Sequence, residues 1–225
     1  MSAVTPNMPW QLQPDDFILS GVSLERCSYQ HYPAIRMTMP SDKIQDPERD
    51  ILADRDFMAW LPLDFGDGEI EAWLASELVS EAPAYARGFI GLTFRIDTKG
   101  QFESIYLRPI NSQADDQVRR NHSVQYVAFP DFRFDRLRRE SPEKYETYAE
   151  LELARWIHMR IVVNGKQAIL YLDHADKPAF IVSDLKLGEA QRGGVGVWLE
   201  SGTVAYFRDL VIRRQTQAQD PITGR

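Results

Sequence analysis

Hydrophobic and polar residues alternate along most of this chain with a period of two, the spacing of a half-buried β-strand. The alternating runs are short and are separated by glycine, proline, asparagine and aspartate, which are typical turn residues. The pattern predicts strands at 22–28, 33–39, 56–62, 69–75, 88–96, 101–108, 123–128, 155–163, 166–172, 178–182, 193–199 and 203–212. So many short strands indicate an all-β protein, folded as a two-sheet sandwich or a closed barrel.

Turn residues join several of the predicted strands. The pair Asn164-Gly165 separates RWIHMRIVV from KQAILYL. It predicts a hairpin with a type I′ turn, because both residues tolerate positive φ angles. Similar pairs stand at Asp67-Gly68, Lys99-Gly100 and Ser201-Gly202. We therefore expect three antiparallel meanders.

The segment SPEKYETYAEL, residues 141–151, has helical character. Ser141 suits the N-cap, Pro142 the first helical position, and Glu143 the positive end of the helix. These features predict one short peripheral helix. A second helical or irregular turn is expected over residues 46–54.

Composition places the chain among ordinary folded proteins. It has 225 residues, of which 44% are hydrophobic and 26% charged, so disorder and collagen-like structure are excluded. Without a linker or repeat, we expect a single β-sandwich domain over residues 1–214 and a polar tail over 215–225. Cys27 is the single cysteine, so the chain can form no internal disulfide.

The charge and the motifs exclude several function classes. A net charge of −7 opposes nucleic-acid binding, and the aromatic pattern of the common RNA-binding sheets is absent. Motifs for dinucleotides, nucleoside triphosphates, serine hydrolases, zinc proteases and EF-hands are also absent. No apolar run approaches the roughly 18 residues of a membrane span, and the N-terminus lacks a secretory signal, so a cytoplasmic protein is expected. The sequence does not indicate an oligomeric state.

Four stretches carry a family resemblance: GFIGLTFRID, GQFESIYLRP, ARWIHMRIVVNGKQAILYLD and GGVGVWLESGTVAYFRDLVIR. Over about residues 56–213 the chain resembles the concanavalin A-like lectin/glucanase jelly rolls, with the laminin-G-like and 3-keto-disaccharide hydrolase-like domains most similar. This resemblance implies a two-sheet antiparallel jelly-roll sandwich with one or two short peripheral helices. Its members include both binders and enzymes. Laminin-G-like relatives often hold calcium, but this chain has no calcium-binding spacing, and we predict no metal or cofactor.

One face of the predicted sheets has the chemistry of a sugar-binding surface. Alternation places Arg95, Tyr106, Arg108 and Trp198 outward on their strands, and Glu71 outward on the strand 69–75. Aromatic rings stack on the C–H face of a sugar, and charged groups bind its hydroxyls. The alternative is an ordinary solvated sheet surface.

A dense polar cluster follows the strand 101–108, in a loop longer than the usual connection of about 4–6 residues. Long ordered loops at a sheet edge are often functional. In the 3-keto-disaccharide hydrolase-like relatives a similar strand leads into a comparable polar loop. The ligand-binding residues predicted from the cluster and the sheet face are Arg95, Tyr106, Arg108, Asn111, Arg119, Asn121, Gln125, Tyr126 and Trp198.

Two neighbouring carboxylates in this loop, Asp115 and Asp116, are candidates for acid/base catalysis. Glycoside cleavage requires two carboxyl groups about 5–9.5 Å apart, so a partner such as Glu71 or Glu200 is needed from the sheet. His122 lies beside the cluster and titrates near neutral pH. The predicted catalytic residues are therefore Asp115, Asp116, His122 and Glu71.

A structural alternative exists for the same aspartates. Asp115 and Asp116 stand three and four residues before Arg119 and Arg120, the spacing of ion pairs in a short helical turn.

A basic run follows, with Arg133, Arg136, Arg138 and Arg139. It suits either an anionic glycan or phosphate, or ion pairs with the acidic segment after it.

The leading hypothesis is a carbohydrate-recognising domain with a saccharide or glycoside ligand, and the sequence leaves open whether it also cleaves a glycosidic bond as a hydrolase or lyase. The alternative is a non-catalytic binding or assembly module with a structural role.

Overall fold

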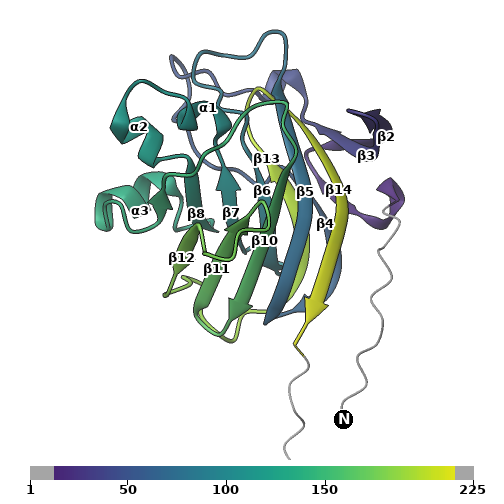
Figure 1. Ribbon diagram of the computed structural model, residues 1–225, viewed down its shortest axis with the longest axis vertical. Helices are drawn as coiled ribbons and strands as arrows, with labels where there is room; N and C mark the ends of the chain where they lie inside the picture. The colour runs from purple at the N-terminus through teal and green to yellow at the C-terminus, as the bar shows by residue number, and fades with distance from the viewer. Residues whose placement is uncertain (1–12, 216–225) are drawn as a thin grey trace, which may run out of the picture.

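The chain forms a sandwich of two antiparallel seven-stranded sheets in the computed structural model, which describes residues 13–215 (Figure 1). Sheet A contains, in spatial order, β1 (Ile18–Ser20), β4 (Met58–Phe65), β13 (Gly193–Leu199), β6 (Ile90–Ile96), β7 (Phe102–Leu107), β8 (Val124–Phe129) and β9 (Glu146–Thr147). Sheet B contains β12 (Phe180–Val182), β11 (Gln167–Leu172), β10 (Ile157–Asn164), β5 (Gly68–Leu78), β14 (Thr203–Arg214), β3 (Tyr32–Thr38) and β2 (Ser23–Tyr29). The all-β jelly-roll prediction is confirmed.

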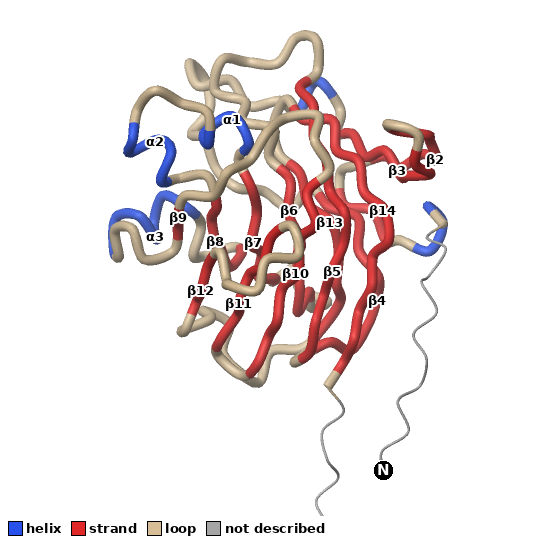
Figure 2. Tube along the Cα trace, in the orientation of Figure 1, coloured by secondary structure: helices blue, strands red, loops and turns tan. Residues whose placement is uncertain are grey.

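Short helices lie at one side of the sandwich, beside β7 and β8 (Figure 2). They are α1 (Pro109–Ser112), α2 (Gln117–Asn121) and α3 (Phe134–Glu140), with two 3-10 turns, η1 (Pro14–Asp16) and η2 (Ser41–Lys43), elsewhere. Among residues 13–215, no helix is long and apolar enough to cross a membrane. The predicted tail over 215–225 falls outside the described residues, apart from Gln215, and so does the N-terminal segment 1–12.

Each of the predicted strands is confirmed, but the helix predicted over 141–151 is wrong. Residues 142–144 form a turn, with Glu143 at a φ of 64°, and the chain then pairs with β8 as the two-residue strand β9. Tyr145 and Glu146 are buried there. Burial of these two side chains at the sheet edge outweighs the local helix signals. The segment 46–54 is irregular, with a turn at 47–49.

The hairpin between β10 and β11 is confirmed, but its turn differs by one residue from the prediction. Asn164 pairs with Gln167, so Gly165 and Lys166 are the central residues. Of the two, Gly165 alone has a positive φ, of 56°, so the type I′ turn is wrong. The predicted turn at Lys99-Gly100 does join paired strands, β6 and β7.

The other two predicted glycine turns do not join paired strands. Asp67-Gly68 leads from β4 of sheet A to β5 of sheet B, and Ser201-Gly202 leads from β13 to β14. They carry the chain between sheets. The antiparallel runs of consecutive strands are β2–β3, β6–β7–β8–β9 and β10–β11–β12.

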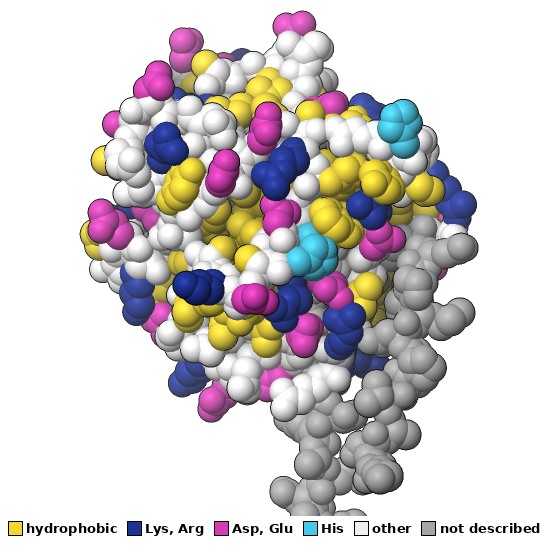
Figure 3. Space-filling model, viewed as in Figure 1, with side chains coloured by type: hydrophobic (Ala, Val, Ile, Leu, Met, Phe, Trp, Pro, Cys, Tyr) yellow, Lys and Arg dark blue, Asp and Glu magenta, His cyan; other side chains and the backbone are white. Residues whose placement is uncertain are grey.

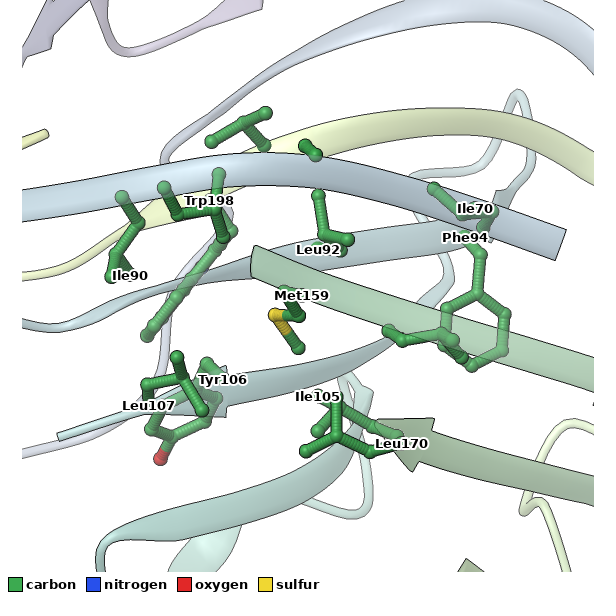
Figure 4. Packing of buried hydrophobic residues seen from close by; sticks show 14 of the residues in the cluster. Ile70, Ile90, Leu92, Phe94, Ile105, Tyr106, Leu107, Met159, Leu170 and Trp198 are labelled. Carbon is green, nitrogen blue, oxygen red and sulfur yellow. The ribbon is translucent and has the colours of Figure 1, made fainter. Parts of the chain in front are cut away.

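The core lies between the sheets. Ile70, Met159 and Leu170 of sheet B pack among residues of sheet A such as Leu92 and Ile105 (Figure 4). All five side chains are fully buried. The core therefore fixes which face of each strand is turned away from it.

Candidate functional site

A pocket of about 280 Å³ opens at the end of sheet A where β6 begins and β7 ends. Its walls come from the segment before β4, the loop before β6, and the helices after β7 and β8. The lining residues are Gln45, Leu52, Ala53, Asp54, Tyr85, Arg87, Phe89, Arg108, Asn111, Arg119, His122, Phe134, Arg138 and Glu200.

Local sequence explains how two of the helices present their side chains. Pro109 occupies the first position of α1, where its fixed φ suits a helix start, so Arg108 is held at the N-cap. Asp116 caps α2, because its Oδ1 accepts a hydrogen bond from the backbone N–H of Arg119 at 2.7 Å. These short helices point Arg108, Asn111 and Arg119 toward one pocket.

The deepest cation of the pocket is Arg108, which is only 5% exposed. Its Nη2 donates to the hydroxyl of Tyr106 at 2.6 Å, and its Nη1 donates to the carbonyl of His122 at 3.1 Å. Nη1 also reaches Oε1 of Gln125 at 3.3 Å. All of these acceptors are uncharged, so the guanidinium is held in place by neutral groups.

Two further arginines share this arrangement. Arg119 donates from Nε to Oδ1 of Asn111 at 3.3 Å, and Arg87 donates from Nη1 to the carbonyls of Ala84 and Ala86. Burial, together with the neighbouring charges of Arg119 and Arg108, lowers the pKa of Arg87 to about 10. The three guanidinium groups therefore repel one another across the pocket.

Two carboxyl groups line the pocket, and both are already bonded to the protein. Asp54 accepts the hydroxyl of Tyr106 at 2.8 Å and the backbone N–H of Phe134 at 3.0 Å. Burial raises the pKa of Asp54 against the opposing charge of Arg108. Glu200 forms an ion pair with Arg55.

His122 lies at the C-terminal end of α2 and contacts Glu146. Its Nε2 is 3.0 Å from Oε1 of Glu146, whose other oxygen is 2.7 Å from Nη2 of Arg138. Burial lowers the pKa of His122 despite the nearby carboxylate. The imidazole is therefore neutral at pH 7, and we assign its Nε2–H as the donor to Glu146.

The structure brings together only part of the predicted site. Arg108, Asn111, Arg119 and His122 line the pocket. Asp115, Asp116 and Asn121 do not: the two aspartates are exposed, and Asn121 accepts a hydrogen bond from Gln117 on the outside of α2. The alternative in which the aspartates pair with Arg119 and Arg120 is also wrong in detail, because Asp116 bonds the backbone rather than a guanidinium.

The expectation that sheet A has a solvated outer face is wrong. Every residue of β6 and β7 is buried, including Tyr106 at 0% exposure, and Trp198 on β13 is 1% exposed. The segment before β4 covers this face: Trp198 donates from Nε1 to the carbonyl of Arg55 at 2.6 Å, and Asp54 accepts from Tyr106. The predicted alternation is correct, but the face it defines is occupied by the chain itself.

Arg95, Gln125 and Tyr126 are also buried and do not line the pocket. Oε1 of Gln125 accepts a hydrogen bond from Arg108, while the hydroxyl of Tyr126 donates to Glu103 at 2.7 Å. Arg95 lies at the far end of β6, where its guanidinium pairs with Glu103 and Asp67 and donates to the carbonyls of Gly66, Gly165 and Gly188. These contacts give Arg95 a role in joining loops.

Glu71 lies on the outer face of sheet B, on a different sheet from the pocket. It pairs with Arg213 at 2.5 Å and with His158 at 3.3 Å, so the predicted carboxylate pair with Asp115 or Asp116 is not formed. Hydrophobic side chains gather on this face of the molecule (Figure 3). There, Arg208 lies against the rings of Tyr32, Trp73 and Trp156.

The basic run of α3 is largely neutralised. Arg136 pairs with Glu140 and Arg139 with Asp135, both on the same helix, and Arg138 pairs with Glu146. The prediction of ion pairs with the following acidic segment is confirmed for Arg138 alone.

Sequence reasoning missed several pocket residues, among them Asp54, Arg87, Phe89 and Phe134. Phe89 belongs to the predicted strand 88–96 but is not among the predicted ligand-binding residues, and the other three lie outside the predicted strands and match no motif. In the part of the chain that the structure describes, no group of three His, Cys, Asp or Glu side chains is arranged to hold a metal ion.

No protein-family model matches the sequence, and no curated protein matches it. Solved structures do match in fold. A protein of unknown function with a galectin-like fold from Bacillus subtilis is 13% identical, with a TM-score of 0.54 over 92% of this chain and 93% of that one.

Two further structures have a similar fold. Carbohydrate-binding module CBM66 from Bacillus subtilis is 12% identical, with a TM-score of 0.50 over 85% of this chain and 94% of that one. A β-glucanase from Bacillus licheniformis is 8% identical, with a TM-score of 0.50 over 92% and 96%. At these identities the similarity establishes the fold alone, and it confirms the resemblance to the concanavalin A-like jelly rolls.

Proposed function

We propose that this protein recognises a saccharide in the pocket at the end of sheet A. The observation that carries the proposal is the combination of lining groups: the aromatic rings of Phe89 and Phe134 stand beside the guanidinium groups of Arg87, Arg108 and Arg119. Rings suit the C–H face of a sugar, and guanidinium forks bind its polar groups. The pocket is concave and mixes apolar walls with a few polar groups, as ligand sites do.

The fold supports the proposal by analogy. Structures with this architecture include one described as a carbohydrate-binding module and one described as a β-glucanase. A fold hosts many functions, so the lining residues carry more weight than the analogy.

The test is binding of labelled protein to an array of neutral and acidic oligosaccharides, followed by calorimetry on the glycans that bind. Phe134→Ala removes one aromatic wall and should weaken binding of the best ligand about 10-fold or more, the scale of one aromatic contact. Phe132→Ala is the matched control, because Phe132 lies outside the pocket lining. Binding of no saccharide on the array at millimolar concentration would contradict the proposal.

Cleavage of a glycosidic bond is the second candidate. It is favoured by two carboxyl groups, Asp54 and Glu200, that line the same pocket in different environments. Burial raises the pKa of Asp54, as a general acid requires, while Glu200 is ion-paired with Arg55. These two residues replace the separated set Asp115, Asp116 and Glu71 as carboxylate candidates.

Turnover of the bound oligosaccharides distinguishes cleavage from recognition. If Asp54 is the acid, Asp54→Asn should lower the rate by about 10²-fold or more while affinity changes little. If the wild-type protein binds a glycan but releases no product from it, cleavage is contradicted and recognition remains as the function.

A further inference from the structure

Three guanidinium groups in the pocket have no ionic partner among residues 13–215. Arg87, Arg108 and Arg119 form no ion pair with any described carboxylate, and their hydrogen bonds go to backbone carbonyls, two side-chain amides and a hydroxyl. The net charge of the chain is −7, so carboxylates are abundant. Asp54 and Glu200 line the same pocket, but neither is within ion-pair distance of these three arginines, and Asp54 is linked to Arg108 only through the hydroxyl of Tyr106.

Two neighbouring arginines, in contrast, each form an ion pair with a glutamate. Arg55 pairs with Glu200 at the rim, and Arg138 pairs with Glu146 through both carboxylate oxygens. A bidentate pair of that kind satisfies a partly buried guanidinium. The unpaired set is therefore distinct from the paired arginines that adjoin it.

Holding these three charges together without a directly paired carboxylate is unfavourable. Arg108 is 5% exposed, and burial together with the other two cations lowers the pKa of Arg87. Buried charges are retained in proteins chiefly where a partner compensates them. A ligand anion in the pocket supplies such a partner.

Donor groups remain for that anion. Arg87 uses Nη1 for the carbonyls of Ala84 and Ala86, and Arg119 uses Nε for Asn111. Nη2 of Arg87 and both Nη groups of Arg119 donate to no described residue. They adjoin the pocket that also contains Arg108.

We propose that the saccharide bound in this pocket carries a negatively charged group, a carboxylate, sulfate or phosphate, which Arg87, Arg108 and Arg119 neutralise. This inference rests on the proposed function, since it names the class of saccharide for the same site. The aromatic walls hold the sugar ring, and the arginines select its charge.

The experiment compares each acidic oligosaccharide with its uncharged counterpart by calorimetry. The probes are oligomers of galacturonate, mannuronate and glucuronate with their methyl esters, sulfated and phosphorylated hexoses with the parent hexoses, and inorganic phosphate and sulfate. At least one acidic sugar should bind 10-fold or more tightly than its neutral counterpart, and this preference should shrink as salt rises. The class of acidic sugar that binds more tightly than its neutral counterpart shows whether the anionic group is a carboxylate, a sulfate or a phosphate.

Variants assign the preference to the pocket. Arg87→Gln and Arg119→Gln should each weaken the acidic ligand roughly 10- to 100-fold, the scale of a charge-assisted hydrogen bond, and weaken its neutral counterpart by a smaller factor. Arg139→Gln is the matched control: it makes the same charge change on α3, where the arginine pairs with Asp135 outside the pocket. Its affinity should match wild type.

The outcomes separate the two proposals. Equal binding of acidic and neutral sugars overturns the anionic class and leaves saccharide recognition intact. Binding of inorganic phosphate or sulfate without any saccharide overturns both, and so does binding of none of the probes. An acidic preference that survives Arg87→Gln and Arg119→Gln overturns the assignment to this pocket.

Discussion

At the scale of single residues, the same side-chain type has two different uses at the two ends of β6. Arg108 and its neighbours face a pocket beside the start of the strand, whereas Arg95 near its other end is 0% exposed and fully engaged by carboxylates and carbonyls. From sequence both arginines belong to an outward-facing polar set. Burial and partner type, which the alternation pattern does not encode, distinguish a structural arginine from one available to a ligand.

Replacement of Arg95 tests its structural role. Arg95→Leu leaves Glu103 buried without its cation and removes the bonds to three loop carbonyls, so unfolding should cost about 3–5 kcal/mol less than in wild type. Urea denaturation followed by tryptophan fluorescence measures the difference. Arg192→Leu is the control, because the exposed pair with Asp64 should contribute less than about 1 kcal/mol. Equal losses in the two variants would refute the role given to Arg95.

His122 makes stability depend on pH. Burial lowers its pKa in the folded state, so the unfolded chain takes up the proton first as pH falls below about 6.5. Stability should therefore fall as pH drops from about 7 through 6.5 toward the lowered pKa. His158, whose pKa burial also lowers, acts in the same direction.

His122→Gln isolates the first contribution. Denaturation at pH 7.5 and at pH 5 should show a smaller loss of stability in the variant than in wild type, with the part due to His158 retained. A variant with an unchanged difference between the two pH values would contradict the assignment.

At the scale of elements, strand positions could be predicted because alternation is a local property. Local signals failed where tertiary contacts decide: Pro142 and Glu143 indicate a helix, but Tyr145 and Glu146 are buried at a sheet edge. They failed again for α3, which was not predicted as a helix and whose Arg136 and Arg139 pair with carboxylates of the same helix, an alternative that the sequence-based predictions did not include. Most of the pocket lining comes from segments outside the predicted strands; Phe89 and Arg108 are the exceptions.

Gly91 shows how closely one strand is fitted to the next. A Cβ there would lie 2.4 Å from Cβ of Tyr106 and 2.6 Å from the carbonyl oxygen of Ile105. The bare backbone lets the Tyr106 ring lie 4.6 Å from the ring of Trp198 on the strand beyond.

Gly91→Ala should therefore destabilise the protein by about 1–3 kcal/mol, the usual cost of overpacking. Gly66→Ala is the matched control, since its added methyl meets only the flexible side chain of Arg192. Thermal denaturation of the two variants compares them. A loss no greater in Gly91→Ala than in Gly66→Ala would contradict the fit described for β6 and β7.

At the scale of the whole molecule, the two-sheet architecture follows from the sequence, but the covering of sheet A does not. The segment 46–54 has no apolar stripe, so nothing in its pattern reveals that Asp54 and the residue after it close over Tyr106 and Trp198. The sequence therefore predicted four residues of the pocket, Arg108, Asn111, Arg119 and His122, but not the wall that the segment 46–54 contributes. A long-range contact of this kind joins positions more than fifty residues apart.

The covered outer face of sheet A limits how the protein can bind a long glycan. A long glycan has no open track across β6 and β7, because every residue of those strands is buried. If the pocket admits a single sugar unit, such a glycan reaches it with a terminal unit or a side branch. Molar affinity should then be nearly independent of chain length beyond the first few sugars, while the amount of protein bound per gram of polymer should fall in inverse proportion to chain length. The amount of bound protein would then depend on the number of chain ends and not on the mass of polymer.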